Sequence, residues 1–208
     1  MVNRAIFFDF DGVIVDSLGL VHATMRKLIP GFALEEVKRI AEGNTINGAA
    51  ARTGLPEKEW LQFWTDNYNP SVISQNIFDG VADAVRSLAE DYRLFVVSST
   101  RKEPIEAYLA KHELTPCFKA VLGADLHASK AEKIRTIFAE HEGLPEESVF
   151  ITDTLGDIRE AREAGVDSIG VTWGYHGPEL LRKGKPYALV DTPEGLLNAV
   201  ARYFAILS

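Results

Sequence analysis

The chain has little cysteine and no long hydrophobic run. Its single cysteine, Cys117, excludes an intramolecular disulfide and any metal site built from several cysteines. Asp9 and Asp11 interrupt the one strongly apolar N-terminal stretch, and no stretch reaches the length of a membrane span. No signal peptide is recognisable in the sequence. We therefore expect a soluble, cytoplasmic protein with no membrane partner.

Positive charge is also scarce, since 22 Lys+Arg stand against 30 Asp+Glu and the formal net charge is −8. A surface of this sign repels phosphate backbones, so we expect no nucleic-acid partner. A local pocket can still reverse the sign and bind a small anion. The glycine-rich phosphate loop Gly-x4-Gly-Lys-Ser/Thr is missing, as are Gly-x-Ser-x-Gly and His-Glu-x-x-His. Their absence argues against P-loop nucleotide binding, an esterase-type serine and a zinc protease.

Short apolar runs alternate with amphipathic stretches over most of the 208 residues. The runs predict strands at residues 4–8, 94–97, 119–122, 148–151, 167–171 and 187–190. The amphipathic stretches predict helices at residues 81–90, 104–112, 130–141, 155–164 and 193–204. This alternation is typical of the α/β class with a doubly wound parallel sheet.

Residues 17–78 break this alternation. Helical periodicity recurs there, at residues 20–29, 33–42, 49–53 and 57–67, without a convincing strand. We predict a small all-helical cap inserted after the first strand, lying over the carboxyl edge of the sheet. The expected division is a core of residues 1–16 and 79–208 and a cap of residues 17–78. Within the cap we expect Trp60, Phe63 and Trp64 to pack its interior.

Polar residues follow each of the first four predicted strands of the core. They are Asp9 and Asp11, then Ser98, then Lys130, then Asp153 and Asp157. Ligands bind outside the carboxyl ends of the strands in open α/β sheets, so we expect these side chains to converge there. Lys133 competes with Lys130, but it lies almost one turn further into the predicted helix, on a charged face.

The convergence of carboxylates predicts a cation site. Asp9 and Asp11 are two residues apart, so both side chains point to the same side if the strand continues. Carboxylates this close repel each other, and a cation must join them. No histidine or cysteine clusters with them, which argues against zinc. Oxygen ligands alone favour Mg²⁺ as the cofactor.

Four segments together resemble the motifs of the haloacid dehalogenase superfamily of phosphohydrolases. The first motif is matched by Asp9-Phe-Asp11-Gly-Val-Ile-Val-Asp16-Ser17 and the second by Val96-Val97-Ser98. Lys130 matches the third, and Thr152-Asp153-Thr-Leu-Gly-Asp157 matches the fourth. The matches occur in the family's order and span residues 4–20 and 80–175.

The resemblance implies a Rossmann-like core with a helical C1-type cap, and it implies roles for the matched residues. Asp9 would be the nucleophile that forms an aspartyl-phosphate, and Asp11 the general acid and base. Ser98 and Lys130 would hold the transferring phosphoryl group, with Ser99 as a further substrate ligand. Mg²⁺ would bind Asp9, the backbone carbonyl of Asp11 and Asp153, with Asp157 supporting it through water.

The cap region suggests a substrate class. The run from Glu42 to Arg52 and the segment Gly170-Val-Thr-Trp173-Gly-Tyr175 resemble phosphoglycolate phosphatases. Arg52 could then pair with a substrate carboxylate as a bidentate fork. The expected substrate is a small phosphorylated metabolite, phosphoglycolate-like or a sugar phosphate, and the expected state is a monomer or homodimer. The role of His22 stays open, whereas His176, in a predicted loop, reads most simply as a surface residue.

Two alternatives from other functional classes stay open. A phosphomutase of the same fold would carry a cap histidine one place before His22, and an arginine where Ile46 stands; both departures favour hydrolysis. A phospho-accepting signalling domain would also group acids, a hydroxyl and a lysine on a parallel sheet. Such a domain is shorter and has no helical insert, and a lasting aspartyl-phosphate would identify it. Dehalogenation is disfavoured because the family's dehalogenases lack an acid at the position of Asp11.

Overall fold

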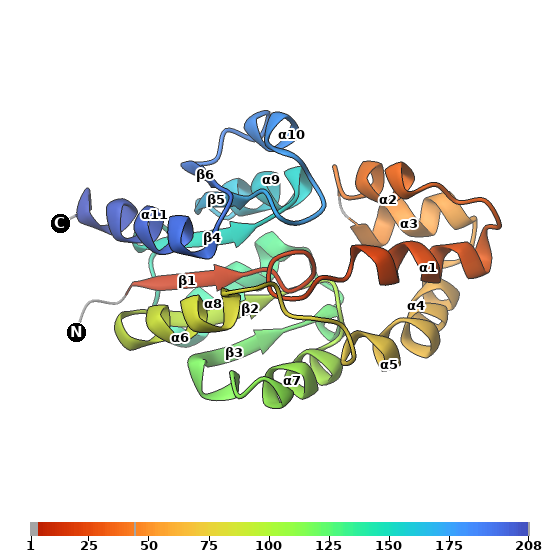
Figure 1. The fold of residues 1–208 in the computed structure, drawn as a ribbon, viewed down its shortest axis with the longest axis horizontal. Helices are drawn as coiled ribbons and strands as arrows, with labels where there is room; N and C mark the ends of the chain where they lie inside the picture. The colour runs from red at the N-terminus through yellow and green to blue at the C-terminus, as the bar shows by residue number, and fades with distance from the viewer. Residues whose placement is uncertain (1–3, 44, 208) are drawn as a thin grey trace.

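The computed structural model describes residues 4–43 and 45–207. Over this part of the chain, the fold is built on a six-stranded sheet in the order β3-β2-β1-β4-β5-β6 with every neighbouring pair parallel (Figure 1). The strands are β1 (Ala5–Phe8), β2 (Arg93–Val97), β3 (Phe118–Leu122), β4 (Ser148–Thr152), β5 (Asp167–Val171) and β6 (Ala188–Val190). The predicted doubly wound α/β core is confirmed, and its strand order reverses between β1 and β4.

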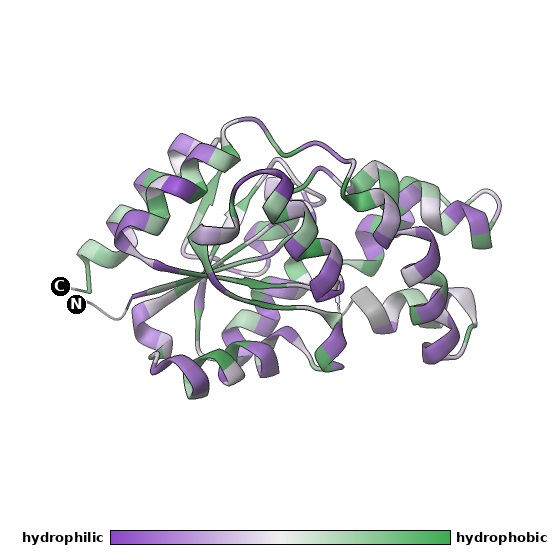
Figure 2. Ribbon diagram, turned by 90° about the horizontal axis from the view of Figure 1, so that it is seen from below, coloured by the Kyte–Doolittle hydropathy of each residue, from purple (hydrophilic) through white to green (hydrophobic). Residues whose placement is uncertain are grey.

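The central strands β1, β2 and β4 are buried along nearly their whole length, which explains why they are mainly apolar runs. Ile6 and Phe8 of β1 pack with one group of helices, α6 (Val81–Asp91), α7 (Lys102–Lys111) and α11 (Pro193–Ala205). Ala5 and Phe7 point to the opposite face and pack with α8 (Lys130–His141) and α9 (Leu155–Glu163). In Figure 2 the strands are mostly hydrophobic, and the helices around them carry many hydrophilic residues. The period-two alternation of side chains therefore divides the core into two layers.

Five helices lie in the chain between β1 and α6. They are α1 (Leu18–Leu28), α2 (Leu34–Ile40), α3 (Thr45–Thr53), α4 (Glu57–Asn67) and α5 (Asn69–Val72). Figure 1 shows them gathered beyond the ends toward which the strands point. This is the arrangement expected of the cap, while its boundaries at residues 17 and 78 stay a prediction. Asn44, in the cap run that suggested a substrate class, lies outside the described residues, and so do the side chains of Thr45 and Ile46.

The differences from the expected elements concern short segments. The chain also forms α5, α10 (Pro178–Arg182) and three short 3-10 turns at Thr115–Cys117, Ala124–Leu126 and Pro145–Glu147. Segments of three to five residues are too short to show a helical period, so the sequence pattern does not predict them. None of the helices in the described ranges combines the length and hydrophobicity needed to cross a lipid bilayer.

Carbonyl groups at the end of α2 accept hydrogen bonds from the core. The three donor–acceptor pairs are His176 Nε2 to Lys38 O (2.7 Å), Gly156 N to Ala41 O (3.2 Å) and Arg159 Nη1 to Glu42 O (2.9 Å). The last carbonyls of a helix have no partner within it, and the first turn of α9 presents free N–H groups. The end of α2 is thus docked on the start of α9.

His176 is an internal residue of this junction, with 1% of its surface exposed. Its Nδ1 accepts a hydrogen bond from the backbone N–H of Leu155 at 3.0 Å. Nε2 therefore carries the proton and donates it to Lys38 O. The expectation that His176 is a surface residue is wrong, because the loop after β5 folds back beneath α2.

Candidate active site

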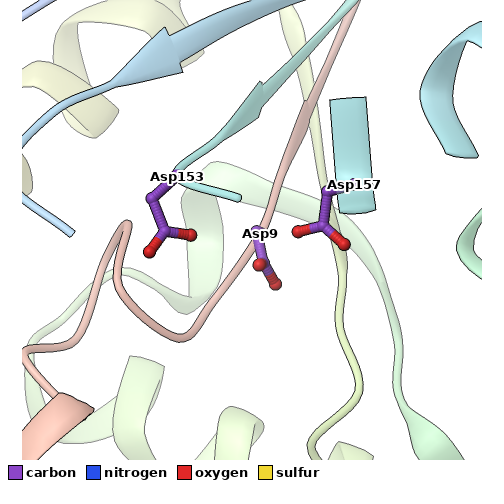
Figure 3. A group of neighbouring side chains, drawn as sticks. All are labelled: Asp9, Asp153 and Asp157. Atoms are coloured by element: carbon purple, nitrogen blue, oxygen red, sulfur yellow. The ribbon is translucent and has the colours of Figure 1, made fainter. Parts of the chain in front are cut away.

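Three carboxylates meet at the carboxyl edge of the sheet. Asp9 follows β1, Asp153 follows β4, and Asp157 stands in the first turn of α9. One oxygen from each lies within 4.8 Å of the others, and all three residues are buried. Figure 3 shows the three side chains at the ends of their elements, turned toward a common space. The expected convergence of these acids at the reversal of strand order is therefore present.

Lys130 lies among these acids. Its Nζ stands 2.8 Å from Asp9 Oδ2 and 2.7 Å from Asp157 Oδ2. Burial alone would lower the pKa of this ammonium group, but the two carboxylates outweigh it and the pKa is raised. The first residue of α8 therefore supplies a fixed positive charge next to Asp9.

Lys133 points away from the acids. Its Nζ donates to the backbone oxygen of Ser98 at 2.7 Å, and only 1% of the residue is exposed. Burial lowers the pKa of this amine to about 8. The expectation that Lys133 stands on a charged face is wrong, because this side of α8 packs against β2.

The three carboxylates of Asp9, Asp153 and Asp157, which we call the triad, carry more negative charge than the single ammonium of Lys130 can balance. Burial raises the pKa of Asp9 well above its usual range and raises that of Asp153 to about 7. For Asp157 burial acts in the same direction, but the ammonium of Lys130 outweighs it and the pKa is lowered. Asp9 and Asp153 thus share the uncompensated charge, and the site is attractive to a further cation.

Two glycines leave the space that the Asp153 carboxylate occupies. A Cβ at Gly12 or Gly174 would collide with Asp153 Oδ2, and Gly12 has a φ of +76°, which favours glycine. The same oxygen accepts a hydrogen bond from the backbone N–H of Tyr175 at 2.7 Å. The other oxygen, Oδ1, is buried without a hydrogen-bond partner among the described residues. A buried orphan oxygen beside two further carboxylates fits a hard divalent cation such as Mg²⁺.

Asp11 is held by two hydroxyl groups rather than by the triad. Its Oδ2 accepts from Thr100 Oγ1 at 2.6 Å, and its Oδ1 accepts from the hydroxyl of Tyr68. Tyr68 is a fully buried residue of the cap, at the junction of α4 and α5. The cap and the core therefore both orient the Asp11 carboxylate. The metal contact predicted for Asp11 involves its backbone carbonyl and stays a prediction.

The segment after β2 brings two hydroxyls to the site. Ser99 and Thr100 line the same cavity as Asp9 and Lys130. Ser98 is fully buried, and its Oγ accepts a hydrogen bond from the backbone N–H of Thr100 at 3.0 Å. The phosphoryl contact predicted for Ser98 stays a prediction. Sequence reasoning missed Thr100, although its place two residues after Ser98 at a strand end was a usable signal.

Arg52 and His22 are bound within the cap. Arg52 Nε stands 2.6 Å from Glu36 Oε2, and 47% of the arginine side chain is exposed. Its guanidinium lies over the ring of Phe32. His22 Nε2 lies 2.8 Å from the backbone oxygen of Phe32. The structure therefore does not bring Arg52 to the acids, because Glu36 already binds its guanidinium on another face of the cap.

A cavity of about 80 Å³ separates the cap from the acids. Its floor includes Asp9, Asp11, Lys130 and Asp157, together with the hydroxyl residues of the core. Residues from helices α1 to α4 form its roof. A space of this size between a docked cap and a charged floor suits a small anionic substrate and excludes a folded macromolecule.

Comparison with known proteins relates this geometry to a family. The family model described as haloacid dehalogenase-like hydrolase matches residues 6–171. A phosphoglycolate phosphatase from Synechococcus elongatus is 28% identical over 207 residues, which cover 96% of this chain and 98% of that protein. The pyrophosphatase PpaX of Listeria innocua is 26% identical over 207 residues, which cover 94% of this chain and 95% of that protein.

Solved structures share the fold. A haloacid dehalogenase-like family hydrolase from Streptococcus pneumoniae aligns with a TM-score of 0.80 at 24% identity, covering 94% of this chain and 97% of its own. CbbY from Rhodobacter sphaeroides, solved in complex with phosphate, aligns with a TM-score of 0.76 at 21% identity, covering 93% of this chain and 95% of its own.

Proposed function

The chain belongs to the haloacid dehalogenase-like hydrolase family, and from this premise we propose that it is a phosphoric monoester hydrolase that acts on small phosphorylated metabolites through an aspartyl-phosphate. The observation that carries the proposal is the position of Asp9, buried against the Lys130 ammonium, with Asp11 lining the same cavity. Relatives named as a phosphoglycolate phosphatase and a pyrophosphatase support a reaction at phosphorus.

Asp9 is the proposed nucleophile. One of its oxygens attacks phosphorus, so that an aspartyl–phosphorus bond forms while the ester P–O bond breaks. Two anions must approach each other in this step, and the ammonium of Lys130, 2.8 Å from Asp9 Oδ2, reduces their repulsion. Phosphoryl transfer depends mainly on such positioning and charge neutralisation, which a buried lysine provides.

Asp11 is the proposed general acid and base. It donates a proton to the departing alkoxide and then accepts one from the water that attacks the aspartyl-phosphate. That second attack breaks the bond between Asp9 and phosphorus, releases inorganic phosphate and restores both carboxyl groups. The hydroxyls of Thr100 and Tyr68 keep the Asp11 carboxylate in one orientation during both transfers.

Mg²⁺ is the proposed cofactor. Asp9, Asp153 and Asp157 would hold it, together with the backbone carbonyl of Asp11, and the orphaned Oδ1 of Asp153 supports this assignment. When bound, the ion neutralises charge on the phosphoryl oxygens. The residues that would hold it follow β1 and β4 or stand in the first turn of α9, so all of them belong to the sheet and the helix that follows β4.

A metabolite screen with metal control tests the function. The purified protein is expected to release inorganic phosphate from at least one phosphate monoester in Mg²⁺, to lose this activity in EDTA, and to regain it when Mg²⁺ is restored. Phosphate release and substrate isomerisation are measured in the same samples. Activity that persists in EDTA contradicts the metal assignment. A stable phosphoprotein without turnover, or an isomerised ester without phosphate release, contradicts hydrolysis.

Replacing Tyr68 with phenylalanine tests the orientation of Asp11. Tyr68→Phe keeps the buried ring but removes one of the two hydroxyls on Asp11, so kcat is expected to fall about tenfold while KM changes little. Tyr108→Phe is the matched control, because the Tyr108 hydroxyl is equally buried and has no hydrogen-bond partner in the described part of the chain. Steady-state kinetics of the two variants decide the point. An unchanged kcat in Tyr68→Phe would show that its hydroxyl does not support catalysis.

A further inference from the structure

The roof of the cavity is apolar, in contrast to its charged floor. Helices α1, α2 and α4 supply most of it, through Met25, Val37, Ile40, Trp60, Leu61 and Trp64. Met25, Val37 and Trp60 are each less than 5% exposed, with values of 2%, 4% and 4%. The leaving group of a phosphate ester bound at Asp9 would therefore meet hydrocarbon and aromatic surface rather than polar groups.

Three cations of the cap have partners away from this cavity. Arg52 binds Glu36, Lys38 binds Glu35, and Lys27 donates to Asn67. Of the cap side chains that the structure describes, none that lines this cavity is charged. Among the described residues that line the cavity, Lys130 alone carries an ammonium group, and it already contacts Asp9 and Asp157. A leaving group that carried a carboxylate would be desolvated there without a cation of its own, which is unfavourable.

Aromatic rings extend from Asp11 into the roof. The Tyr68 hydroxyl donates to Asp11, and the Tyr68 ring stacks on Trp64 with centroids 4.6 Å apart and planes 17° apart. Trp64 in turn contacts Trp60 at 4.9 Å between centroids. We call these three rings the aromatic wall. Of these rings, Trp60 and Trp64 line the cavity together with Asp11, while Tyr68 lies behind them. Because Asp11 protonates the leaving oxygen in the proposed mechanism, the leaving group meets the wall at Trp60 and Trp64.

We infer that the preferred substrate is the phosphate monoester of an uncharged alcohol that bears an aromatic ring. The inference rests on the proposed function, because it assumes that the phosphoryl group binds at the charged floor of the cavity and that the leaving group lies against the aromatic wall. Ring stacking and apolar contact then bind the leaving group, and no cation is needed. The inference differs from what the name of the relative from Synechococcus elongatus suggests, because glycolate carries a carboxylate and no ring.

Three esters of primary alcohols separate the possibilities on the wild-type enzyme. Benzyl phosphate, glycerol 3-phosphate and 2-phosphoglycolate all lose an alkoxide, so their intrinsic reactivities are similar. We expect kcat/KM for benzyl phosphate to exceed that for 2-phosphoglycolate by about tenfold or more. Equal or better hydrolysis of 2-phosphoglycolate or glycerol 3-phosphate overturns the inference and leaves the proposed function intact. If the enzyme hydrolyses neither these three esters nor any other phosphate ester, both the inference and the proposed function are overturned.

A charge placed in the roof tests the cause of the preference. Leu61 lines the cavity and is half-buried, so the long side chain of a lysine there can keep its ammonium partly in water. Leu61→Lys is expected to lower kcat/KM for benzyl phosphate and to raise kcat/KM for 2-phosphoglycolate. Gln62→Lys is the matched control, because it adds the same charge one residue further along α4, at an exposed position outside the cavity. The control should leave the ratio of the two values unchanged.

The ratio of the two kcat/KM values is the decisive measurement, because a general loss of folded enzyme would lower both values together. A shift of the ratio toward 2-phosphoglycolate in Leu61→Lys alone supports the inference. The same ratio in Leu61→Lys as in the wild type, or the same shift in Gln62→Lys, contradicts it. If Leu61→Lys does not fold, the comparison of the three esters on the wild-type enzyme still decides.

Discussion

Asp9→Asn is expected to lower kcat by about 10⁴-fold or more, which is the size of effect seen when an enzyme loses its nucleophile. Asparagine has nearly the same shape as aspartate, but its amide oxygen does not displace an alcohol from phosphorus. The measurement is phosphate release under saturating substrate and Mg²⁺. Activity within about tenfold of the wild type would rule out an aspartyl-phosphate at this position.

The same variant should remain folded. Burial raises the pKa of Asp9, so its ionised form destabilises the folded state at neutral pH. A neutral asparagine removes this penalty and leaves Lys130 paired with Asp157, so the melting temperature of Asp9→Asn is expected to equal or exceed that of the wild type. Asp83→Asn is a suitable control, because the Asp83 side chain is 87% exposed on α6 and pairs with the surface residue Arg86. It should change neither activity nor melting temperature.

Lys130→Met is expected to reduce both activity and stability. The substitution keeps a long apolar stem but leaves Asp9 and Asp157 buried without the ammonium that contacts both. Removing one partner of a buried ion pair destabilises a protein by about 3–5 kcal/mol. The lost charge at the phosphoryl group should lower kcat by about 10³-fold, as the removal of a preorganised electrostatic contact does in other enzymes. Denaturant unfolding and steady-state kinetics measure the two effects.

Lys133→Met provides the matched control for this prediction. Lys133 is three residues further along α8 and even less exposed, but its Nζ bonds a backbone oxygen instead of a carboxylate. Its loss is expected to reduce kcat by less than about tenfold, because it makes no contact with the acids. Adding Asp157→Asn to Lys130→Met should restore part of the stability and none of the activity. Equal loss of activity in Lys130→Met and Lys133→Met would contradict the role assigned to Lys130.

The sequence predicted the sheet and the place of the acids for a physical reason. Parallel strands in the middle of a sheet are buried on both faces and are therefore apolar runs, so β1, β2 and β4 stand out in the sequence. The polar residues that follow these three runs mark the carboxyl edge. Asp9, Asp153 and Lys130 follow from this edge alone, without knowledge of side-chain packing. Their proximity depends only on strand order, which βαβ units largely determine.

Features that depend on packing between distant segments could not be predicted in the same way. Tyr68 reaches Asp11 across 57 residues of sequence, and Arg52 is bound by Glu36, 16 residues away on another helix. Nothing in the local pattern around either residue indicates its partner. The burial of Lys133 and His176 has the same origin. Trp60 packs with Phe63 and Trp64 in the cap as expected, but Trp60 and Trp64 also line the cavity, which the sequence did not indicate.

The docking of α2 on α9 has a consequence for the catalytic cycle. The helix that carries Asp157 into the triad also holds three cap carbonyls through Gly156, Arg159 and the adjacent His176. In the proposed mechanism, opening of the cap to release phosphate would break these bonds, so the contacts that hold the cap over the cavity would also delay the release of product. Tighter docking would protect the covalent intermediate and lengthen the dwell time of phosphate, whereas looser docking would do the reverse. The strength of the contact between α2 and α9 would therefore set a compromise between protection of the proposed aspartyl-phosphate and the rate of product release.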